Sequence, residues 1–252
     1  MKTILITGCS SGFGLDIAKY FLERDWKVIA TMRTPREDLF PPSENLRVLS
    51  LDVTKAESIR AAIEAAGPID VLVNNAGIGW LNALEGTSME KVREIFETNT
   101  FGTMATIQAV IPQFRERKEG IIINVTSSVT LRPLHLLSVY TASKAAVNGF
   151  TESLALELQP FNIRVHIVLP GRAPGTRFGD NARAQMPVFP EPYAGLVQSI
   201  LEGWAQSTRP ITESLAVAEV VWQAVTDPTS PSRLPAGADA VALAQITAKP
   251  LA

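Results

Sequence analysis

Short runs of apolar, mostly β-branched residues alternate along this chain with longer segments in which apolar residues recur every three or four positions. Strand-length runs that are apolar almost throughout are typical of strands buried on both faces of a parallel sheet. The longer segments have the spacing of amphipathic helices. This alternation predicts right-handed strand–helix–strand crossovers, and therefore an α/β fold with a doubly wound parallel sheet and helices on both faces.

About seven strands are expected, because short apolar runs of this kind recur and the last of them is weak. These runs are Thr3–Thr7, Lys27–Met32, Leu46–Leu51, Val71–Asn74, Ile121–Val125, Val165–Leu169 and Asp239–Leu243. The expected helices are Asp16–Arg24, Ala56–Ala66, Met89–Arg117, Val139–Leu158 and Ser214–Val225. The proline-containing stretch 34–45 is predicted to be a surface loop.

We expect one domain over residues 1–252, since no linker or repeat interrupts the pattern. The alternation of strand and helix patterns stops between about residues 172 and 212, where prolines, glycines and large aromatic side chains are frequent. Such a stretch is typical of a loop-and-helix insertion that covers a binding site.

Charge and composition exclude several classes of function. The net charge of −2 gives no field that would attract nucleic acid, and no apolar stretch approaches the roughly 18 residues of a membrane-spanning helix. The single cysteine, Cys9, cannot form an intramolecular disulfide, which favours a reducing compartment such as the cytoplasm. No His, Cys and carboxylate cluster has metal-ligand spacing, so we expect no metal.

A glycine-rich loop, Thr7-Gly8-Cys9-Ser10-Ser11-Gly12-Phe13-Gly14, follows the first strand and opens a helical pattern. Glycines at such a place allow a tight turn and let the backbone approach a pyrophosphate at the positive helix N-terminus. The alternative is a purely structural turn, because the glycine spacing differs from the usual dinucleotide fingerprint. The strand–loop–helix context favours a Rossmann-type cofactor site. The predicted contacts are Gly8, Ser10, Ser11, Gly12, Phe13 and Gly14, with Cys9 as a spacer.

Two further motifs end strands at the same predicted edge of the sheet. Asp52 and Val53 follow the third strand, where the Asp52 carboxylate suits an adenine amino group and equally suits a helix N-cap. Asn75, Ala76 and Gly77 follow the fourth strand, and their small size suits close approach to a ribose. A plain exit from strand to turn is the alternative.

Tyr140 and Lys144 lie one turn apart on one face of a predicted helix. A phenol has a pKa of about 10, so it needs a nearby positive charge to exchange protons near neutrality. The alternative is a packed ring beside a solvated amine. Ser127 closes the fifth strand at the same edge, and Asn99 stands inside a helical stretch where helix propensity disfavours it. Together these residues favour a proton-transfer site centred on Tyr140.

In order from Gly8 to Pro170-Gly171, these motifs resemble the short-chain dehydrogenase/reductase family, including its retinol and hydroxysteroid dehydrogenases and carbonyl reductases. The resemblance implies that Tyr140 is the catalytic acid/base and that Lys144 lowers its pKa and binds the nicotinamide ribose. It also implies that Ser127 binds the substrate oxygen and that Asn99 holds a water in a proton relay. Pro170 and Gly171 would contact the cofactor, and the chain would form a homodimer or homotetramer.

The run after Gly171 departs from the family pattern. Ala173 is small where the family has a larger aliphatic residue, and Thr176 stands one residue late. We therefore carry no contact with the nicotinamide carboxamide over to either residue.

NADP(H) is the predicted cofactor, with NAD(H) as an alternative. An acidic residue at the end of the second strand binds the adenosine ribose in NAD enzymes, whereas an arginine accommodates the 2′-phosphate of NADP. Here the second strand ends in Met32-Arg33, so Arg33 is expected to pair with the phosphate. Its alternative is a solvated charge. Arg36 adds a second cation, offset by Glu37 and Asp38.

The substrate is predicted to be apolar and of moderate size, because the segments expected to wall the site are rich in apolar side chains. These are Trp80, Leu131, Leu134, Leu136, Leu137, Phe178, Met186 and Phe189. Arg132 and Arg172 make an anionic substrate the minority case. His135 suits either substrate contact or an exposed loop, and His166 is expected to be a structural histidine with its hydrogen bonds satisfied. The stripe Val92, Ile95 and Phe96 is expected to pack in the core or at a subunit contact.

The predicted function is NADP(H)-dependent interconversion of a ketone or aldehyde and its alcohol. A cofactor-binding sensor without turnover is one alternative, although such a protein has no need of Asn99, Ser127, Tyr140 and Lys144 together. A dehalogenase on the same scaffold is another, which the intact glycine loop and Lys144 disfavour.

Overall fold

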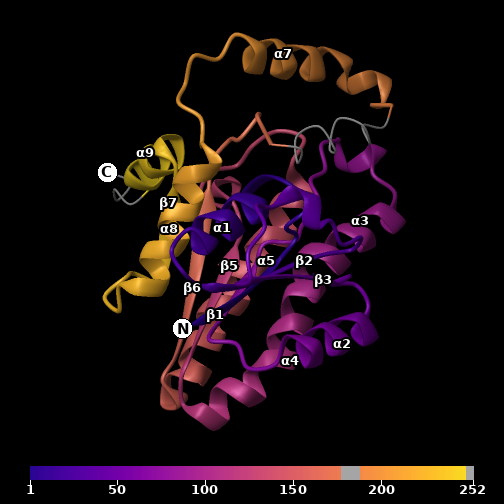
Figure 1. Ribbon diagram of the computed structural model, residues 1–252. Coiled ribbons are helices and arrows are strands. Elements are labelled where there is room, and N and C mark those ends of the chain that lie inside the picture. Colours follow the sequence, from indigo (N-terminus) through magenta and orange to yellow (C-terminus); the bar gives the residue numbers. More distant parts are fainter. Residues whose placement is uncertain (177–187, 248–252) are drawn as a thin grey trace.

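The computed structural model describes residues 1–176 and 188–247, and the strands in these residues form one parallel sheet in the order β3-β2-β1-β4-β5-β6-β7 (Figure 1). The strands are β1 (Thr3–Thr7), β2 (Lys27–Met32), β3 (Leu46–Ser50), β4 (Val71–Asn74), β5 (Gly120–Val125), β6 (Ile163–Pro170) and β7 (Arg233–Ala236). The doubly wound Rossmann-type sheet predicted from the alternating pattern is confirmed.

Helices fill the connections between strands. They are α1 (Gly12–Leu22), α2 (Ala56–Ala66), α3 (Met89–Phe96), α4 (Gly102–Arg117), α5 (Ser138–Leu158), α7 (Ala194–Ala205), α8 (Ser214–Thr226) and α9 (Ala238–Thr247). A π turn, η3 (Glu97–Phe101), joins α3 to α4, so the predicted helical stretch is continuous but not uniformly α. The predicted loop 34–45 holds only the short 3₁₀ turn η1 (Glu37–Leu39).

The weak seventh strand was predicted in the wrong place. Residues 239–243 lie inside α9, and β7 is formed by Arg233–Ala236 instead. The physical reason is composition, because alanines with high helix propensity intersperse the apolar residues of this run. Gly237, at φ +96°, makes the turn that separates the strand from the helix.

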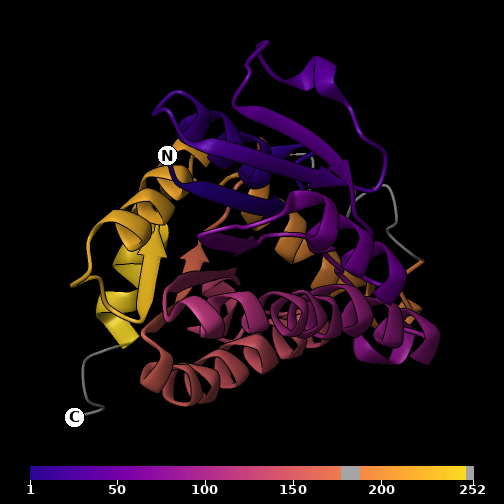
Figure 2. The ribbon, with the colours of Figure 1, turned by 60° about the horizontal axis from the view of Figure 1, so that its bottom comes forward.

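Two apolar layers hold the sheet between helices. On one face α1 and α8 pack against Ile4 and Ile6 of β1 and their neighbours. On the other face α2, α4 and α5 pack against Leu5 of β1, Leu72 and Ile122. Figure 2 shows α4 and α5 along one side of the strands and α8 along the other. This two-sided burial explains why the strands are apolar almost throughout.

Parallel pairing brings the carboxyl ends of the central strands to one edge. β1 pairs with β2 on one side and β4 on the other, so the direction of winding reverses between β1 and β4. Open α/β sheets bind ligands in the crevice outside the strand ends at such a reversal. Thr7, Asn74, Val125 and Pro170 all end strands there.

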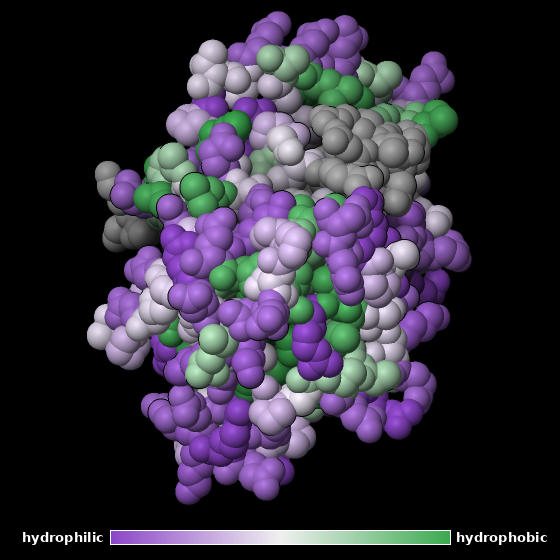
Figure 3. All heavy atoms as spheres, viewed as in Figure 1, coloured by the Kyte–Doolittle hydropathy of each residue, from purple (hydrophilic) through white to green (hydrophobic). Residues whose placement is uncertain are grey.

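The segment after β6 carries α7, which stands at the top of Figure 1, apart from the two layers. Its N-terminal half packs through Val197 and Ile200 on Leu81, Ala83 and Leu136, a contact that we call the lid cluster. Leu201 and Trp204, further along α7, are 40% and 41% exposed, and Figure 3 shows apolar side chains gathered at this end of the molecule.

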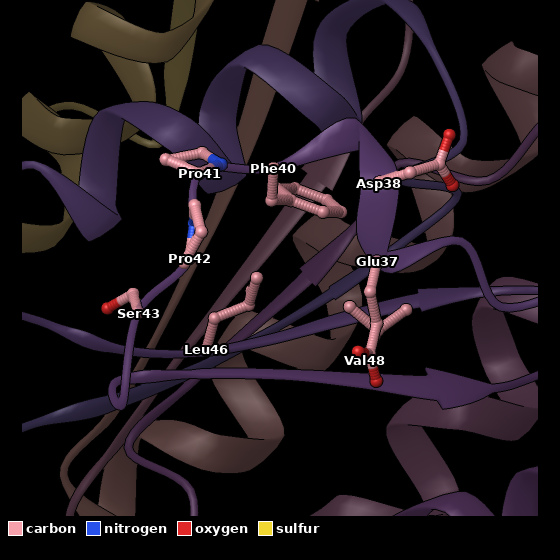
Figure 4. Close-up of a pocket in the computed structure, with 8 residues that line it drawn as sticks. All are labelled: Glu37, Asp38, Phe40, Pro41, Pro42, Ser43, Leu46 and Val48. Carbon is pink, nitrogen blue, oxygen red and sulfur yellow. The ribbon is translucent and has the colours of Figure 1, made fainter.

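One pocket of about 370 Å³ lies away from that edge of the sheet, between the loop that contains η1 and the outermost strand β3 (Figure 4). It is lined by Glu37, Asp38, Phe40, Pro41, Pro42, Ser43, Leu46 and Val48, none of which is a predicted site residue. Across residues 1–176 and 188–247, no helix has the length and apolarity needed to cross a membrane.

His166 is only half satisfied, in contrast to the prediction. Its ring is 4% exposed in β6, and Nδ1 lies 2.9 Å from the carbonyl oxygen of Pro231. Nε2 is buried without a hydrogen-bond partner. Burial lowers the pKa of His166 below its usual value, and the nearby positive charge of Arg164 acts in the same direction, whereas the bond to Pro231 opposes both.

This lowered pKa predicts a loss of stability in acid. The unfolded histidine binds a proton below about pH 6.5 while the folded one stays neutral, so the free energy of unfolding falls as the pH drops from 6.5. His166→Asn keeps a donor for Pro231 and does not titrate. Urea unfolding at pH 7.5 and 5.5 should show the parent losing about 1 kcal/mol more than this variant. The exposed His135→Asn is the control, and equal losses in parent and His166→Asn would contradict the prediction.

Candidate active site

The glycine loop after β1 is shaped by contacts that no larger residue would permit. Gly8 and Gly12 have φ of +76° and +57°, the left-handed region that favours glycine. A Cβ at Gly14 would lie 2.4 Å from the carbonyl oxygen of Gly8. The loop leads directly into α1, whose first backbone N–H groups have no intrahelical acceptor. It therefore forms a small cradle of donors suited to an anion such as a pyrophosphate.

The exit of β4 holds this loop in place. The Thr7 hydroxyl accepts hydrogen bonds from the backbone N–H groups of Asn75 and Ala76, both at 3.0 Å. The Asn75 amide donates back to the carbonyl oxygens of Thr7 at 3.0 Å and Gly8 at 3.2 Å. Asn75 thus braces the loop, and Thr7 is a structural residue of the site that the sequence reasoning missed. A β-branched threonine ending a buried strand gave no signal beyond strand propensity.

The other loop residues differ in their surroundings. Ser10 is exposed, and Ser11 precedes α1 without a side-chain capping bond. Phe13, predicted to contact the cofactor, packs against the first core layer. Cys9 is fully buried, and burial raises the pKa of its thiol to about 12, with a smaller opposing effect from a backbone hydrogen bond. A thiol with this pKa is not a reactive thiolate, in agreement with its predicted role as a spacer.

Ser127, Tyr140 and Lys144 are brought together at the carboxyl end of β5. Their exposures are 8%, 7% and 5%. The hydroxyls of Ser127 and Tyr140 share a hydrogen bond. Lys144 Nζ donates to the carbonyl oxygen of Val125, the last residue of β5, at 3.1 Å. The helix α5 therefore presents the phenol and the ammonium to the same strand end.

The protonation states of the pair follow from burial. Burial raises the pKa of the Tyr140 phenol above its ordinary value, and the bond with Ser127 only partly opposes this. Burial also lowers the pKa of Lys144, to about 8. The pKa of Tyr140 is therefore raised, opposite to the lowering expected from Lys144, and at neutral pH the site presents a neutral phenol and a cationic ammonium.

Asn99 lies in the π turn η3 and is 1% exposed. Its amide both accepts from and donates to the backbone of Ile78, at 2.8 and 3.0 Å. It also donates to the Ser143 hydroxyl at 3.1 Å, between Tyr140 and Lys144 on α5. Asn99 therefore ties the segment after β4 to the helix that carries the pair. π turns are rare and occur frequently at functional sites.

Gly77 separates Asn99 from Lys144. A Cβ at this position would lie 3.2 Å from Asn99 Oδ1 and 3.3 Å from Lys144 Nζ. A methyl group would be in tight contact with both polar atoms. The glycine therefore leaves the space between Asn99 Oδ1 and Lys144 Nζ free of a side chain. The four predicted catalytic residues thus meet around the ends of β4 and β5.

Asp52 is not a helix cap. Its Oδ1 accepts from the N–H and hydroxyl of Thr54 at 3.0 and 2.8 Å, whereas α2 begins only at Ala56 without a side-chain cap. Burial raises the pKa of Asp52, but the bonds from Thr54 and the charges of Arg33 and Lys55 outweigh it, so the net pKa is lowered. The N-cap interpretation is therefore wrong. Its neighbour Val53 is buried against Gly102.

At the end of β2, Arg33 is exposed and Met32 is buried. Met32 is 3% exposed and packs in the first core layer, whereas Arg33 is exposed. Arg36 forms an ion pair with Asp38, which occupies its charge. Arg33 is thus an exposed cation at this corner, and its charge also acts on the Asp52 carboxylate.

The residues expected to line the substrate site lie in different surroundings. Leu136, Leu137 and Phe189 belong to the lid cluster, whereas Trp80 is buried behind it, with its indole N–H bonded to Thr87. Leu134 is 45% exposed and Leu131 half-buried. Phe178 and Met186 lie outside the described residues. The stripe Val92, Ile95 and Phe96 packs with Trp80 in a small core, which confirms the core interpretation.

Leu136, which lies between Ser127 and Tyr140 in the sequence, has an unusual backbone conformation. Its φ is +61°, which is rare for a bulky residue. Its carbonyl oxygen accepts from Asn82 N at 2.9 Å, and its side chain is buried in the lid cluster. Residues in such conformations concentrate at functional sites. His135, one residue earlier, is exposed.

A family model described as short chain dehydrogenase matches residues 2–187. The chain belongs to the short-chain dehydrogenase family. Human retinol dehydrogenase 8 is 39% identical over 181 residues, which are 68% of this chain and 58% of that protein. This chain therefore spans less than two thirds of that relative.

Solved structures of the short-chain dehydrogenase family extend the similarity to nearly the whole fold. A short-chain dehydrogenase from Streptomyces avermitilis is 32% identical with a TM-score of 0.81, covering 97% of this chain and 90% of that one. A closed form of serine dehydrogenase, complexed with NADP+, is 29% identical with a TM-score of 0.79, covering 93% of this chain and 94% of that one.

The buried ammonium yields a direct prediction. In ¹³C NMR of protein labelled at lysine Cε, one resonance should titrate near pH 8, because burial lowers the pKa of Lys144. Lys144→Met assigns the resonance by removing it. The exposed Lys118→Met is the control and should leave that resonance in place. The prediction fails if no resonance that titrates near pH 8 is lost in Lys144→Met.

Proposed function

We propose that the chain is an NADP(H)-dependent oxidoreductase that interconverts a ketone or aldehyde and the corresponding alcohol. The observation that carries the proposal is the buried arrangement at the ends of β4 and β5. Tyr140 and Ser127 share a hydrogen bond there, and Lys144 and Asn99 flank Gly77. Two hydroxyl donors with a cation beside them match the needs of a carbonyl oxygen that gains negative charge.

A bound nicotinamide cofactor supplies the hydride chemistry. In the reductive direction Tyr140 donates its proton to the substrate oxygen, and Ser127 holds that oxygen by a second hydrogen bond. The raised pKa of Tyr140 keeps its hydroxyl protonated for this role. In the oxidative direction Tyr140 has to be a phenolate, which the ammonium of Lys144 stabilises, and it becomes a neutral phenol when it accepts the proton of the alcohol. Asn99 holds the backbone of Ile78 beside this path and is proposed to orient a relay water.

The residues around the glycine loop fit such a cofactor. The loop offers backbone N–H donors at the start of α1, and the absence of a Cβ at Gly14 lets the helix pack closely against the carbonyl oxygen of Gly8. We propose that Ser10, Ser11 and Gly12 bind the pyrophosphate and that Asp52 and Val53 bind the adenine. Ala76, Gly77 and Lys144 would line the ribose, and Pro170 and Gly171 the nicotinamide. The NADP+ complex of serine dehydrogenase supports this assignment.

An apolar substrate of moderate size is proposed from the lid cluster. The side chains of Leu81, Leu136 and Val197 pack together, and Leu136 lies two residues before α5, the helix that carries Tyr140. A mostly apolar wall with a few fixed polar groups is typical of pockets for neutral organic ligands. Human retinol dehydrogenase 8, a relative named for an apolar alcohol, supports the substrate class.

We propose one domain over residues 1–252 and a homodimer or homotetramer. The single cysteine supports a reducing compartment such as the cytoplasm. Across the two described ranges, no three potential metal-ligating side chains gather in a group.

Replacing Tyr140 by phenylalanine tests the proton-transfer role. The ring stays packed while the hydroxyl is lost, so NADPH should bind as in the parent. Turnover should fall by about two orders of magnitude or more, the scale expected for a lost general acid. Binding is measured by nucleotide fluorescence, and turnover by the absorbance of NADPH with aryl ketones, retinoid-like aldehydes and keto acids.

Tyr20→Phe, on the outer helix α1, is the matched control and should keep full activity. Near-full activity of Tyr140→Phe would overturn the mechanism. A parent that binds NADPH and reduces no carbonyl compound would favour the sensor over the enzyme. Faster reduction of keto acids than of apolar ketones would contradict the proposed substrate class.

Arg33 is expected to set the cofactor preference. Arg33→Gln should weaken NADPH binding about tenfold and leave NADH binding nearly unchanged, because only NADPH carries the phosphate that the guanidinium pairs with. Arg36→Gln is the matched control, since Arg36 is already paired with Asp38. Dissociation constants for both nucleotides decide the matter. An Arg33→Gln variant with unchanged selectivity, or a parent that prefers NADH, would contradict the assignment. Substitution of Met32 would instead test core packing.

A further inference from the structure

The two ends of the segment between β6 and α8 meet in a partly buried hydrogen-bond cluster. Asp239, in the first turn of α9, accepts from the backbone N–H of Arg172 at 2.7 Å and from the Thr212 hydroxyl at 2.6 Å, one bond to each carboxylate oxygen. The same Thr212 oxygen accepts from the N–H of Gly171 at 3.0 Å. The N–H of Thr212 donates to the carbonyl oxygen of Arg172 at 2.8 Å. We call these four residues the Thr212–Asp239 latch.

The latch is packed without spare room. A Cβ at Gly171 would lie 2.2 Å from both carboxylate oxygens of Asp239. A Cβ at Gly237 would lie 2.1 Å from the Thr212 hydroxyl oxygen. Thr212 is 2% exposed, so its hydroxyl cannot exchange these partners for water. Bonds to a carboxylate are stronger than neutral ones, and buried groups that lose them remain unsatisfied.

The latch adjoins the proposed active site on two sides. It holds the backbone directly after Pro170, the last residue of β6, which runs beside the strand that ends before Ser127. The helix α9 that carries Asp239 also contacts η4 (Ser128–Thr130), the turn that follows Ser127. A shift of Asp239 would therefore move both the Pro170-Gly171 backbone and the support of the Ser127 turn.

We propose that Thr212 and Asp239 are positioning residues that fix the Pro170-Gly171 backbone for the nicotinamide end of the cofactor and anchor the segment bearing α7 over the substrate. The inference rests on the proposed function and extends it to residues that touch neither reactant. Asp239 acts by accepting two bonds at once, a task that an amide cannot perform because one of its two polar atoms is a donor.

The test compares Thr212→Val, Thr212→Ser and Asp239→Asn with the parent. Valine keeps the shape of threonine and removes the hydroxyl, whereas serine keeps the hydroxyl. Asp227→Asn is the matched control, because Asp227 makes the same kind of paired bonds to Thr229, at 2.8 and 2.6 Å, in an exposed turn. The readouts are the dissociation constant of NADPH by fluorescence, kcat and KM for a ketone, and thermal unfolding.

Thr212→Val and Asp239→Asn should each weaken NADPH binding about tenfold, the effect of one lost buried hydrogen bond. KM for the ketone should rise more than kcat falls, because the acid/base residues are untouched. In Thr212→Ser, the dissociation constant of NADPH and the KM for the ketone should both stay close to those of the parent. Asp227→Asn should leave both unchanged.

Unchanged NADPH affinity and KM in a folded Thr212→Val would overturn the proposal, and so would a Thr212→Ser variant as impaired as Thr212→Val. If Asp239→Asn does not fold, the two Thr212 variants decide. A parent that does not bind NADPH would overturn the proposed function itself, whereas an active parent with unaffected latch variants would overturn the latch alone.

Discussion

The bond between the end of β1 and the end of β4 organises this molecule. One hydroxyl oxygen, that of Thr7, accepts two backbone N–H groups from the neighbouring strand's exit, and Asn75 returns two bonds to the glycine loop. At a reversal of winding, adjacent chains turn away from each other and would leave backbone groups unpaired. The brace satisfies those groups while it holds the two loops at a fixed separation. Asn99 and Lys144 lie on either side of Gly77, which belongs to the second of these loops.

Burial then determines the chemistry that this frame supports. Tyr140 and Lys144 are both buried, and the loss of water raises the pKa of the phenol and lowers that of the ammonium, which favours the uncharged form of each side chain. The phenol therefore stays protonated and can donate a hydrogen bond. The pKa of Lys144, about 8, lies close enough to neutral pH for the charge of this side chain to depend on its surroundings. A pair on the surface would have neither property.

Sequence patterns predicted the sheet because a strand buried on two faces leaves few polar positions, so β1 and β2 were bounded to the residue. The same sequence patterns did not predict whether side chains near the site point toward the site or into the core. Met32 and Phe13 occupy positions beside the site in sequence but turn into the core. Asp239 resembled a strand start because apolar residues follow it, and only the tertiary fold reveals that it bonds Thr212 and Arg172. Long-range bonds of this kind leave no periodic trace in the chain.

The π turn that carries Asn99 has a consequence for how this helix can change through evolution. A π turn contains one residue more than an α turn, so the extra residue is taken up within Glu97–Phe101 and the flanking helices α3 and α4 keep their faces. Deleting one residue there would restore a regular α-helix and leave the apolar stripe of α3 against Trp80 and Val139. The deletion would remove the wide turn from which Asn99 reaches both Ile78 and Ser143. The length of the helix at this point is therefore tied to the position of one buried amide, whereas its surface residues are free to vary.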